Sequence, residues 1–318
     1  MRVCIIGAGA LGSTIGATLS EGGGERMSVS LVDPFRAHVD AIAEHGLVVR
    51  TGDGPRADDR VVSVDARTSC DGLGVVDVVI VLVKSFVTRA AVEGARSLIG
   101  PDTVVITLQN GLGNEETIAE VVGGQHVLNG TTYVGGRLIG PGHVSSGVIG
   151  RKTIIGEFDG QMSARVTRIA QEFTAAGLET TATHDIQGIK WDKLLVNVST
   201  AALSTITGLE YGDLYAVPEI EECAVAAIRE GMAVAQALGI TLTQTDPSSV
   251  WRSAAKDLPR DFKTSMLQSV EAGSRTEIDV INGSIVRWGE RTGVPTPVNT
   301  TLVAGVKGIE AKLRGAAR

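Results

Sequence analysis

The amino-acid sequence predicts an α/β domain with a doubly wound, mostly parallel sheet, followed by an all-α domain. Three observations support this fold class. A glycine-rich turn follows an apolar run at the start of the chain. Strand-like and helix-like segments then alternate as far as about residue 155, and from about residue 163 the apolar spacing is that of helices. We therefore expect a first domain at residues 1–184 and a second at residues 185–318.

The first apolar run, Val3 to Ile6, is too short for a helix and is typical of a strand buried on both faces. Gly7, Gly9 and Gly12 follow it with the spacing G-x-G-x-x-G. In a βαβ unit these glycines allow a tight turn, the approach of a pyrophosphate, and close packing of the next helix, expected at 11–20. That helix would offer its first N–H groups to an anion. The residues predicted to bind a dinucleotide here are Gly7, Gly9, Ala10, Leu11 and Gly12.

A second strand, at 29–32, ends in Asp33, which lies 21 residues beyond Gly12. A carboxylate in this place can bind the ribose hydroxyls of a dinucleotide. The alternative is a glycine-rich turn in some other βαβ unit. Strand, helix and acid together favour a Rossmann-type, dinucleotide-binding domain.

The other elements follow in chain order. In the first domain we expect helices at 37–44, 87–99 and 115–122, strands at 75–83, 103–108, 127–134 and 152–156, and a hairpin excursion over 46–65. After residue 163 the strand-like runs end, and we expect helices at 166–176, 189–205, 219–238, 266–291 and 300–313.

Composition excludes several classes of protein. Of the 318 residues, 29 are Lys or Arg and 36 are Asp or Glu, so the net charge of −7 and the lack of a basic run disfavour nucleic acid as a partner. Cys4, Cys70 and Cys223 are too scattered for a disulfide framework or a zinc site. The most apolar run, 75–83, is short and contains Asp77, so no membrane span is expected. A strand at the very N-terminus leaves no signal peptide, and we expect a cytoplasmic protein.

Two polar residues follow strands at the sheet edge where a cofactor is expected. Lys84 comes after the run at 75–83, and Asn110 after the run at 103–108. A lysine there can bind a phosphate or carboxylate, and an amide can bind a ribose or a substrate. The alternatives are a solvated surface lysine and an ordinary Asn-Gly turn.

In the second domain, Lys193 and Asn197 are four residues apart and share one helix face. A lysine beside apolar neighbours could protonate a carbonyl oxygen as a hydride reaches its carbon. The alternative is an exposed lysine on an amphipathic helix. Further along, Ser265 could cap a helix and Glu277 could be a surface acid. A carboxylate beside Lys193 would favour its protonated form.

Four segments together resemble the ketopantoate (2-dehydropantoate) reductase family. They are GAGALG at 7–12, QNGLGNE at 109–115, WDKLLVN at 191–197 and SMLQSVEAGSRTEIDVINGSIV at 265–286, and GTTYVGGRLIGPGHV at 130–144 also fits. The resemblance covers nearly the whole chain. It implies a reductase that uses NAD or NADP on a branched 2-oxo acid, with a Rossmann domain and a helical domain.

By position, the resemblance implies that Lys193 is the general acid and that Glu277 organises Lys193 and the substrate hydroxyl. The other implied site residues are Asn197 and Ser265 for the substrate, Asn110 for both substrate and cofactor, and Lys84 and Glu277 for the cofactor. No metal is implied. A homodimer through the helical domain is expected by family similarity.

Two positions depart from the family pattern. A second asparagine is usual four residues after the first, and here it is Ala201, which removes a hydrogen-bond partner of about 0.5–1.5 kcal/mol. This exchange favours a 2-oxo acid without the 4-hydroxyl group of ketopantoate. Asp33 replaces a usual arginine and favours NAD, although Arg36 could reach the 2′-phosphate of NADP. The alternatives are a D-2-hydroxy acid dehydrogenase for other branched or aromatic 2-oxo acids and a non-catalytic dinucleotide sensor.

Overall fold

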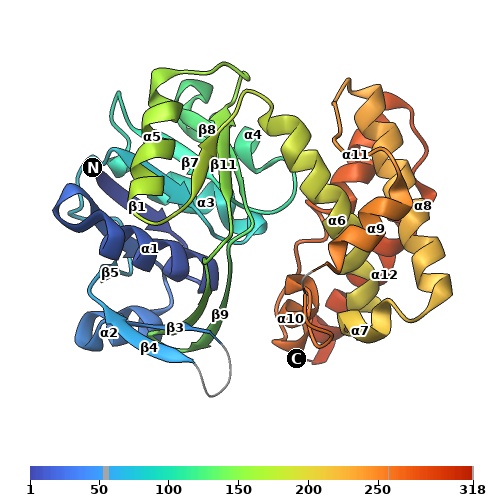
Figure 1. The fold of residues 1–318 in the computed structure, drawn as a ribbon, viewed down its shortest axis with the longest axis horizontal. Helices are drawn as coiled ribbons and strands as arrows, with labels where there is room; N and C mark the ends of the chain where they lie inside the picture. The colour runs from blue at the N-terminus through green and yellow to red at the C-terminus, as the bar shows by residue number, and fades with distance from the viewer. Residues whose placement is uncertain (53–56, 257, 317–318) are drawn as a thin grey trace. The chain divides into compact units, whose positions relative to one another are not determined.

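The computed structural model describes residues 1–52, 57–256 and 258–316 (Figure 1). The chain forms two compact units. The α/β unit contains Met1–Gln109 and Asn114–Ile186, and the helical unit contains Asn110–Gly113 and Gln187–Arg318. The domain boundary at 184/185 stays a prediction. The inclusion of 110–113 in the helical unit is a property of the fold that the sequence pattern does not indicate.

The α/β unit is built on an eight-stranded sheet with the order β12-β11-β8-β7-β6-β1-β2-β5. Neighbouring strands are parallel, except that β8 and β11 are antiparallel. The order β5-β2-β1-β6-β7-β8 is that of a doubly wound dinucleotide-binding sheet, so the predicted fold class is confirmed. The strands are β1 Arg2–Ile6, β2 Ser28–Val32, β5 Asp65–Arg67, β6 Val78–Val81, β7 Val104–Thr107, β8 Val127–Thr132, β11 Thr153–Glu157 and β12 Thr180–Ala182.

Helices pack on both faces of this sheet. They are α1 Ala10–Gly23, α2 Arg36–His45, α3 Thr88–Gly94, α4 Asn114–Val122 and α5 Ala164–Ala175. Alternation along β1 sends Ile5 into one core with Ile15 of α1 and Phe173 of α5. Cys4 enters the opposite core with Ile118 of α4. Both faces are therefore dry, which explains why these strands read as continuous apolar runs.

A smaller, four-stranded sheet has the order β4-β3-β10-β9. β3 Leu47–Thr51 and β4 Asp58–Val62 form the predicted hairpin, whose turn at 53–56 lies outside the described residues. β9 Gly135–Gly140 and β10 His143–Gly147 are absent from the sequence prediction. β9 is exposed and rich in glycine, so it carries no alternating apolar signal.

The helical unit contains α6 Ile186–Thr207, α7 Tyr211–Leu214, α8 Pro218–Ala237, α9 Pro247–Ala254, α10 Ser265–Glu271, α11 Asn282–Thr292 and α12 Pro297–Ala316. Its core includes Trp251, which is 1% exposed and stacks on Tyr215 with 4.0 Å between ring centroids. In the described part of the chain no helix has the length and apolarity needed to cross a membrane.

Two sequence predictions about the chain after residue 163 are wrong. The helix predicted at 266–291 is two helices, α10 and α11, because Gly273 takes a left-handed conformation with φ +67° and the chain stays non-helical as far as residue 281. A strand, β12, also occurs after residue 163, where only helices are expected. It is three residues long and is recognised by its pairing with β11 rather than by a local pattern.

Candidate functional site

In the glycine-rich loop between β1 and α1, two glycines have no room for a side chain and the third has free space beside it. Gly7 has φ +98°, and a Cβ there would lie 2.7 Å from the Val83 nitrogen. A Cβ on Gly12 would lie 1.9 Å from the Gly7 oxygen, so α1 packs directly on the turn. A Cβ on Gly9 would meet no chain atom within 4 Å. The space in front of Gly9 is therefore open to a ligand.

The start of α1 suits an anion. Gly9 occupies the N-cap position without a side-chain cap, and the first turn contains no acidic residue. Ala10 and Leu11 begin the helix, so their N–H groups lie at the positive end of its dipole. Together with the open space at Gly9, this loop fits the pyrophosphate of a dinucleotide cofactor.

A buried histidine holds this loop in place. Gly142 N–H donates to His38 Nδ1 at 2.9 Å, so the hydrogen of the ring lies on Nε2, which is 3.0 Å from Ser13 Oγ. Ser13 in turn donates to the Ala8 carbonyl at 2.8 Å. Burial lowers the pKa of His38, which favours this neutral form, although Asp33 acts in the opposite direction. His38 is outside every motif noted in the sequence.

Asp33 and Arg36 lie beyond the end of β2, where the sequence places them. The Asp33 Oδ1 atom accepts a hydrogen bond from Phe35 N–H at 2.9 Å, which orients the carboxylate. Arg36 is exposed and is the first residue of α2. A carboxylate and a guanidinium group are thus available at this edge of the sheet.

The ends of β6 and β7 are joined by Gln109. Its Nε2 atom donates to the Val83 carbonyl at 2.7 Å and to Thr88 Oγ1 at 2.8 Å. Lys84, the next residue after Val83, is exposed and precedes a short 3-10 turn. Gln109 is buried and directly precedes Asn110. It therefore orders the backbone of both predicted site segments.

Lys193 and Asn110 meet in the helical unit. Lys193 Nζ donates a hydrogen bond to Asn110 Oδ1 at 3.0 Å, although 83 residues separate them. The loop that carries Asn110 is bound at a second point, where Leu112 N–H donates to the Val280 carbonyl at 3.0 Å. Between them, Gly111 has φ +83°, and a Cβ there would lie 2.3 Å from the Val280 oxygen. Only glycine permits this approach.

The surroundings of Lys193 disfavour its charged form. Burial and repulsion by Lys190, one turn earlier on α6, lower the pKa of Lys193 to about 8. A carboxylate close to the amine would act in the opposite direction. An amine with a pKa near neutrality exchanges its proton more readily than an ordinary lysine.

The remaining predicted residues occupy different positions in the helical unit. Asn197 is half-buried on α6, on the same face as Lys193, and Ala201, a turn later, is 5% exposed and packs in the core. Ser265 does not cap α10. The cap is Thr264, whose hydroxyl accepts a hydrogen bond from Leu267 N–H at 3.2 Å, and Ser265 is the exposed first helical residue.

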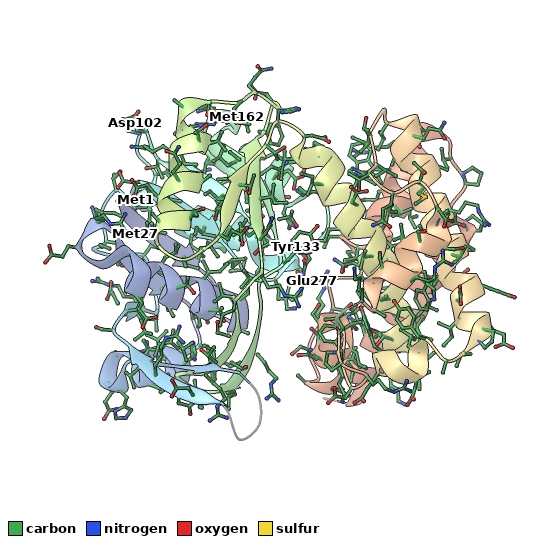
Figure 2. The ribbon with its side chains drawn as sticks, viewed as in Figure 1. Met1, Met27, Asp102, Tyr133, Met162 and Glu277 are labelled. Atoms are coloured by element: carbon green, nitrogen blue, oxygen red, sulfur yellow. The ribbon has the colours of Figure 1, made fainter. Side chains whose placement is uncertain are left out.

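Glu277 is buried in the non-helical segment between α10 and α11 (labelled in Figure 2). Its carbonyl accepts hydrogen bonds from Val280 N–H at 3.1 Å and Ile281 N–H at 3.2 Å. Glu277 and Val280 thus lie in the same short turn, and the loop of Asn110 is bound to this turn at the Val280 carbonyl. Among the described residues, no three His, Cys, Asp or Glu side chains are placed to hold a metal ion.

Comparisons with known proteins give the same family over nearly the whole chain. Two family models match, Ketopantoate reductase PanE/ApbA at residues 3–160 and Ketopantoate reductase PanE/ApbA C terminal at residues 185–310. A 2-dehydropantoate 2-reductase of Halobacterium salinarum is 35% identical over 95% of this chain and 96% of its own. A PanE/ApbA family ketopantoate reductase crystal structure from Ralstonia eutropha is 33% identical, with 99% and 100% of the two chains covered and a TM-score of 0.88. D-mandelate dehydrogenase, solved with NADH and anilino(oxo)acetate, is 26% identical, with 99% of each chain covered and a TM-score of 0.90.

Two glycine variants test the loop. We expect Gly12→Ala to lower the free energy of unfolding by about 1–3 kcal/mol, because the added methyl group overlaps the Gly7 carbonyl. Gly9→Ala should change it by less than about 1 kcal/mol. It should nevertheless weaken NADH binding about tenfold or more, because the methyl group would stand where a pyrophosphate approaches. Urea unfolding and fluorescence titration with NADH measure the two effects. Unchanged NADH binding by Gly9→Ala would contradict the assignment.

Proposed function

The chain belongs to the ketopantoate reductase family, and from this premise we propose that it reduces 2-dehydropantoate, or a closely related branched 2-oxo acid, to the 2-hydroxy acid. The family consists of NAD(P)-dependent oxidoreductases. The observation that carries the proposal is the hydrogen bond between Lys193 and Asn110, since it joins the loop after β7 to a lysine with a lowered pKa.

In the proposed reaction the keto carbon would receive a hydride from the nicotinamide cofactor when this is bound. Lys193 donates a proton to the carbonyl oxygen, so that one hydride and one proton convert the ketone to the alcohol. The ammonium group also stabilises the negative charge that develops on this oxygen. Asn110 Oδ1 accepts a hydrogen bond from Lys193 Nζ and thereby aims the amine. After the reaction the neutral amine takes a proton from solvent.

The other site residues have supporting roles in this proposal. Asn197 shares the Lys193 face of α6 and would contact the substrate. The exposed hydroxyl of Ser265, at the start of α10, would contact the substrate carboxylate. Glu277 would organise Lys193 and the substrate hydroxyl, and Asn110, Lys84 and Glu277 would contact the cofactor. Each role comes from the family resemblance at the matching position.

We further propose NADH as the preferred cofactor. The Asp33 carboxylate follows β2 and is held in one orientation by the Phe35 N–H. Such a group binds a free ribose diol and repels a 2′-phosphate. The structural neighbour D-mandelate dehydrogenase was solved with NADH. Arg36 is the residue that would support NADPH instead. A homodimer and a cytoplasmic location stay predictions.

An assay with matched substrates tests the activity. Reduced-cofactor oxidation is followed with ketopantoate and with 2-oxoisovalerate, which lacks the 4-hydroxyl group. We expect the higher kcat/KM with ketopantoate, as the names of the relatives indicate. The comparison is informative because Ala201 stands where an asparagine is usual in the family. One hydrogen bond of about 0.5–1.5 kcal/mol changes the ratio of the two kcat/KM values about two- to tenfold. Faster turnover of 2-oxoisovalerate or an aromatic 2-oxo acid would support the dehydrogenase alternative. Cofactor binding without turnover of any 2-oxo acid would support the sensor.

The pH dependence tests Lys193. Reduction needs the protonated amine, so kcat should be constant below pH 8 and fall as the pH rises through about 8. Lys193→Met should lower kcat about 10²–10⁴-fold and abolish this alkaline limb, with NADH affinity nearly unchanged. Lys152→Met is the matched control, since Lys152 is an exposed lysine in the α/β unit paired with Glu179. An alkaline limb that persists in Lys193→Met would assign the titration to another group.

The cofactor proposal predicts the effect of removing the Asp33 carboxylate. Asp33→Ala should lower the ratio of kcat/KM for NADH to that for NADPH about tenfold, equivalent to about 1.4 kcal/mol, because repulsion of the 2′-phosphate is lost. Arg36→Ala should change the ratio in the opposite direction. Steady-state kinetics with both cofactors measure it, and a wild type that prefers NADPH would contradict the proposal.

A further inference from the structure

Glu277 lies on a backbone segment that belongs to no helix or strand. The chain between α10 and α11 is non-helical, and Thr276, Glu277 and Ile278 are nevertheless all buried. Placement of a reacting group to within a fraction of an ångström requires a supporting structure around it. For Glu277, whose role rests on the proposed function, this support comes from another element of the helical unit.

The support is a buried carboxylate on α12. Glu310 is 2% exposed, and its Oε1 atom accepts two hydrogen bonds from Thr276, one from the backbone N–H at 2.8 Å and one from the hydroxyl at 2.7 Å. The Thr276 hydroxyl oxygen in turn accepts a hydrogen bond from Ile278 N–H at 3.3 Å. The backbone N–H groups of the residues before and after Glu277 are therefore held through one carboxylate oxygen.

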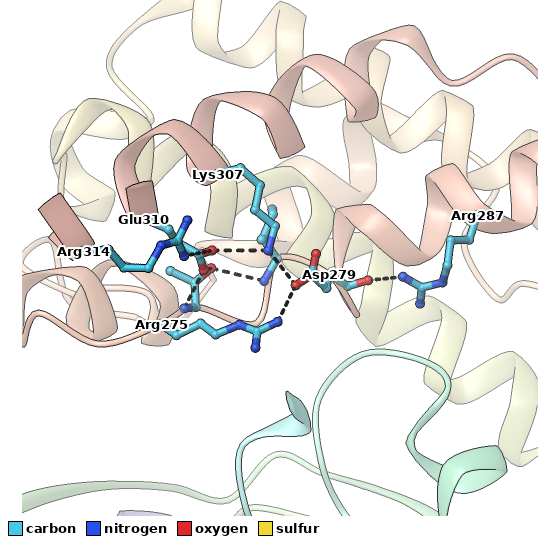
Figure 3. A network of polar contacts seen from close by, with 8 residues as sticks. Arg275, Asp279, Arg287, Lys307, Glu310 and Arg314 are labelled. Carbon is cyan, nitrogen blue, oxygen red and sulfur yellow. Dashed lines mark hydrogen bonds and ion pairs between the residues drawn. The ribbon is translucent and has the colours of Figure 1, made fainter. Parts of the chain in front are cut away.

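Ion pairs hold the carboxylate itself (Figure 3). Lys307, one turn earlier on α12, donates to Glu310 Oε2 at 3.2 Å and to Asp279 Oδ2 at 2.6 Å. Arg275 also contacts Asp279, at 3.1 Å. Burial raises the pKa of Glu310, but the hydrogen bonds from Thr276 and Lys307 outweigh it and lower the pKa below its ordinary value. Glu310 is consequently ionised at neutral pH, with both oxygens as acceptors.

We propose that Glu310 is a positioning residue for the reaction, and that it acts through Thr276 to fix the backbone that presents Glu277. A buried charged network is a costly way to stabilise a fold, since an apolar side chain of similar volume often does so equally well. The directed contacts of Glu310 with both groups of Thr276 are what an apolar residue cannot supply.

Paired variants test this role. Glu310→Ala removes both hydrogen bonds from Thr276, whereas Thr276→Val removes only those of the hydroxyl group and keeps that of the backbone N–H. We expect each variant to lower kcat about tenfold or more, because a misplacement of about 1 Å in the active site costs up to 10² in rate. Glu310→Gln retains a side-chain oxygen, and Thr276→Ser retains the hydroxyl, so both should keep kcat within about threefold. Because Glu277 would also contact the cofactor, Glu310→Ala and Thr276→Val should weaken NADH binding as well, whereas Glu310→Gln and Thr276→Ser should leave it unchanged. If Glu310→Ala does not fold, the Thr276→Val and Thr276→Ser pair carries the test.

Two controls separate positioning from stability. Arg314→Ala removes an exposed partner 3.9 Å from Glu310 Oε2 and should leave kcat unchanged. Leu302→Ala removes a buried core side chain of α12 and should lower the Tm without lowering kcat in the folded protein. If Glu310→Ala and Thr276→Val behave like Leu302→Ala, with a lower Tm and an unchanged kcat, the positioning role is overturned.

The outcome is distinguishable from failure of the proposed function. An active wild type with unaffected variants overturns only the positioning role. A wild type that reduces no 2-oxo acid overturns both, and amide hydrogen exchange at Thr276 and Ile278 then still reports whether Glu310 holds the segment. Faster exchange at both amides in Glu310→Ala, restored in Glu310→Gln, is the expected result.

Discussion

The proposed chemistry of this protein depends on the partial burial of one ammonium group. Removal of Lys193 from water disfavours its charge, and the neighbouring Lys190 adds repulsion, so the pKa of Lys193 is lowered to about 8. The group remains largely protonated at neutral pH, yet its proton is more easily lost than that of a solvated lysine. A single environment thus supplies both a positive charge and a transferable proton at the same atom.

Asn110, which accepts the hydrogen bond of this lysine, and Glu277 both lie on irregular backbone, which must be held by specific contacts. Asn110 belongs to a loop that is bound through Leu112 to the Val280 carbonyl, and Gly111 makes this contact sterically possible. The turn of Val280 also contains Glu277, and α12 holds the residues beside it through Glu310. Helices therefore provide the rigid frame, while a few directed hydrogen bonds fix the segments between them.

In the α/β unit the glycine-rich loop is likewise held by specific contacts. At Gly7 and Gly12 nearby backbone atoms leave no room for a side chain, whereas a Cβ on Gly9 would meet no chain atom within 4 Å. A neutral His38 connects this loop to the turn of the smaller sheet through Ser13 and Gly142. The surface that would receive a pyrophosphate is thus part of a hydrogen-bonded network and not an isolated turn.

The local pattern of the sequence was sufficient to predict the β1–α1 turn, the alternation of strands and helices, and the shared helix face of Lys193 and Asn197. Each of these features depends on residues only a few positions apart. Only the tertiary structure decided the rest. The helix predicted at 266–291 is interrupted, and Thr264 replaces Ser265 as the cap. The strands β9, β10 and β12 are defined by pairing, since β10 pairs with the distant β3 and with its neighbour β9, and β12 pairs with β11. The meeting of Asn110 with Lys193 and the support of Thr276 by Glu310 join residues 83 and 34 positions apart. The direction of the Lys193 pKa shift likewise follows from burial. Such contacts depend on how elements pack, a property that the spacing of residues along the chain does not contain.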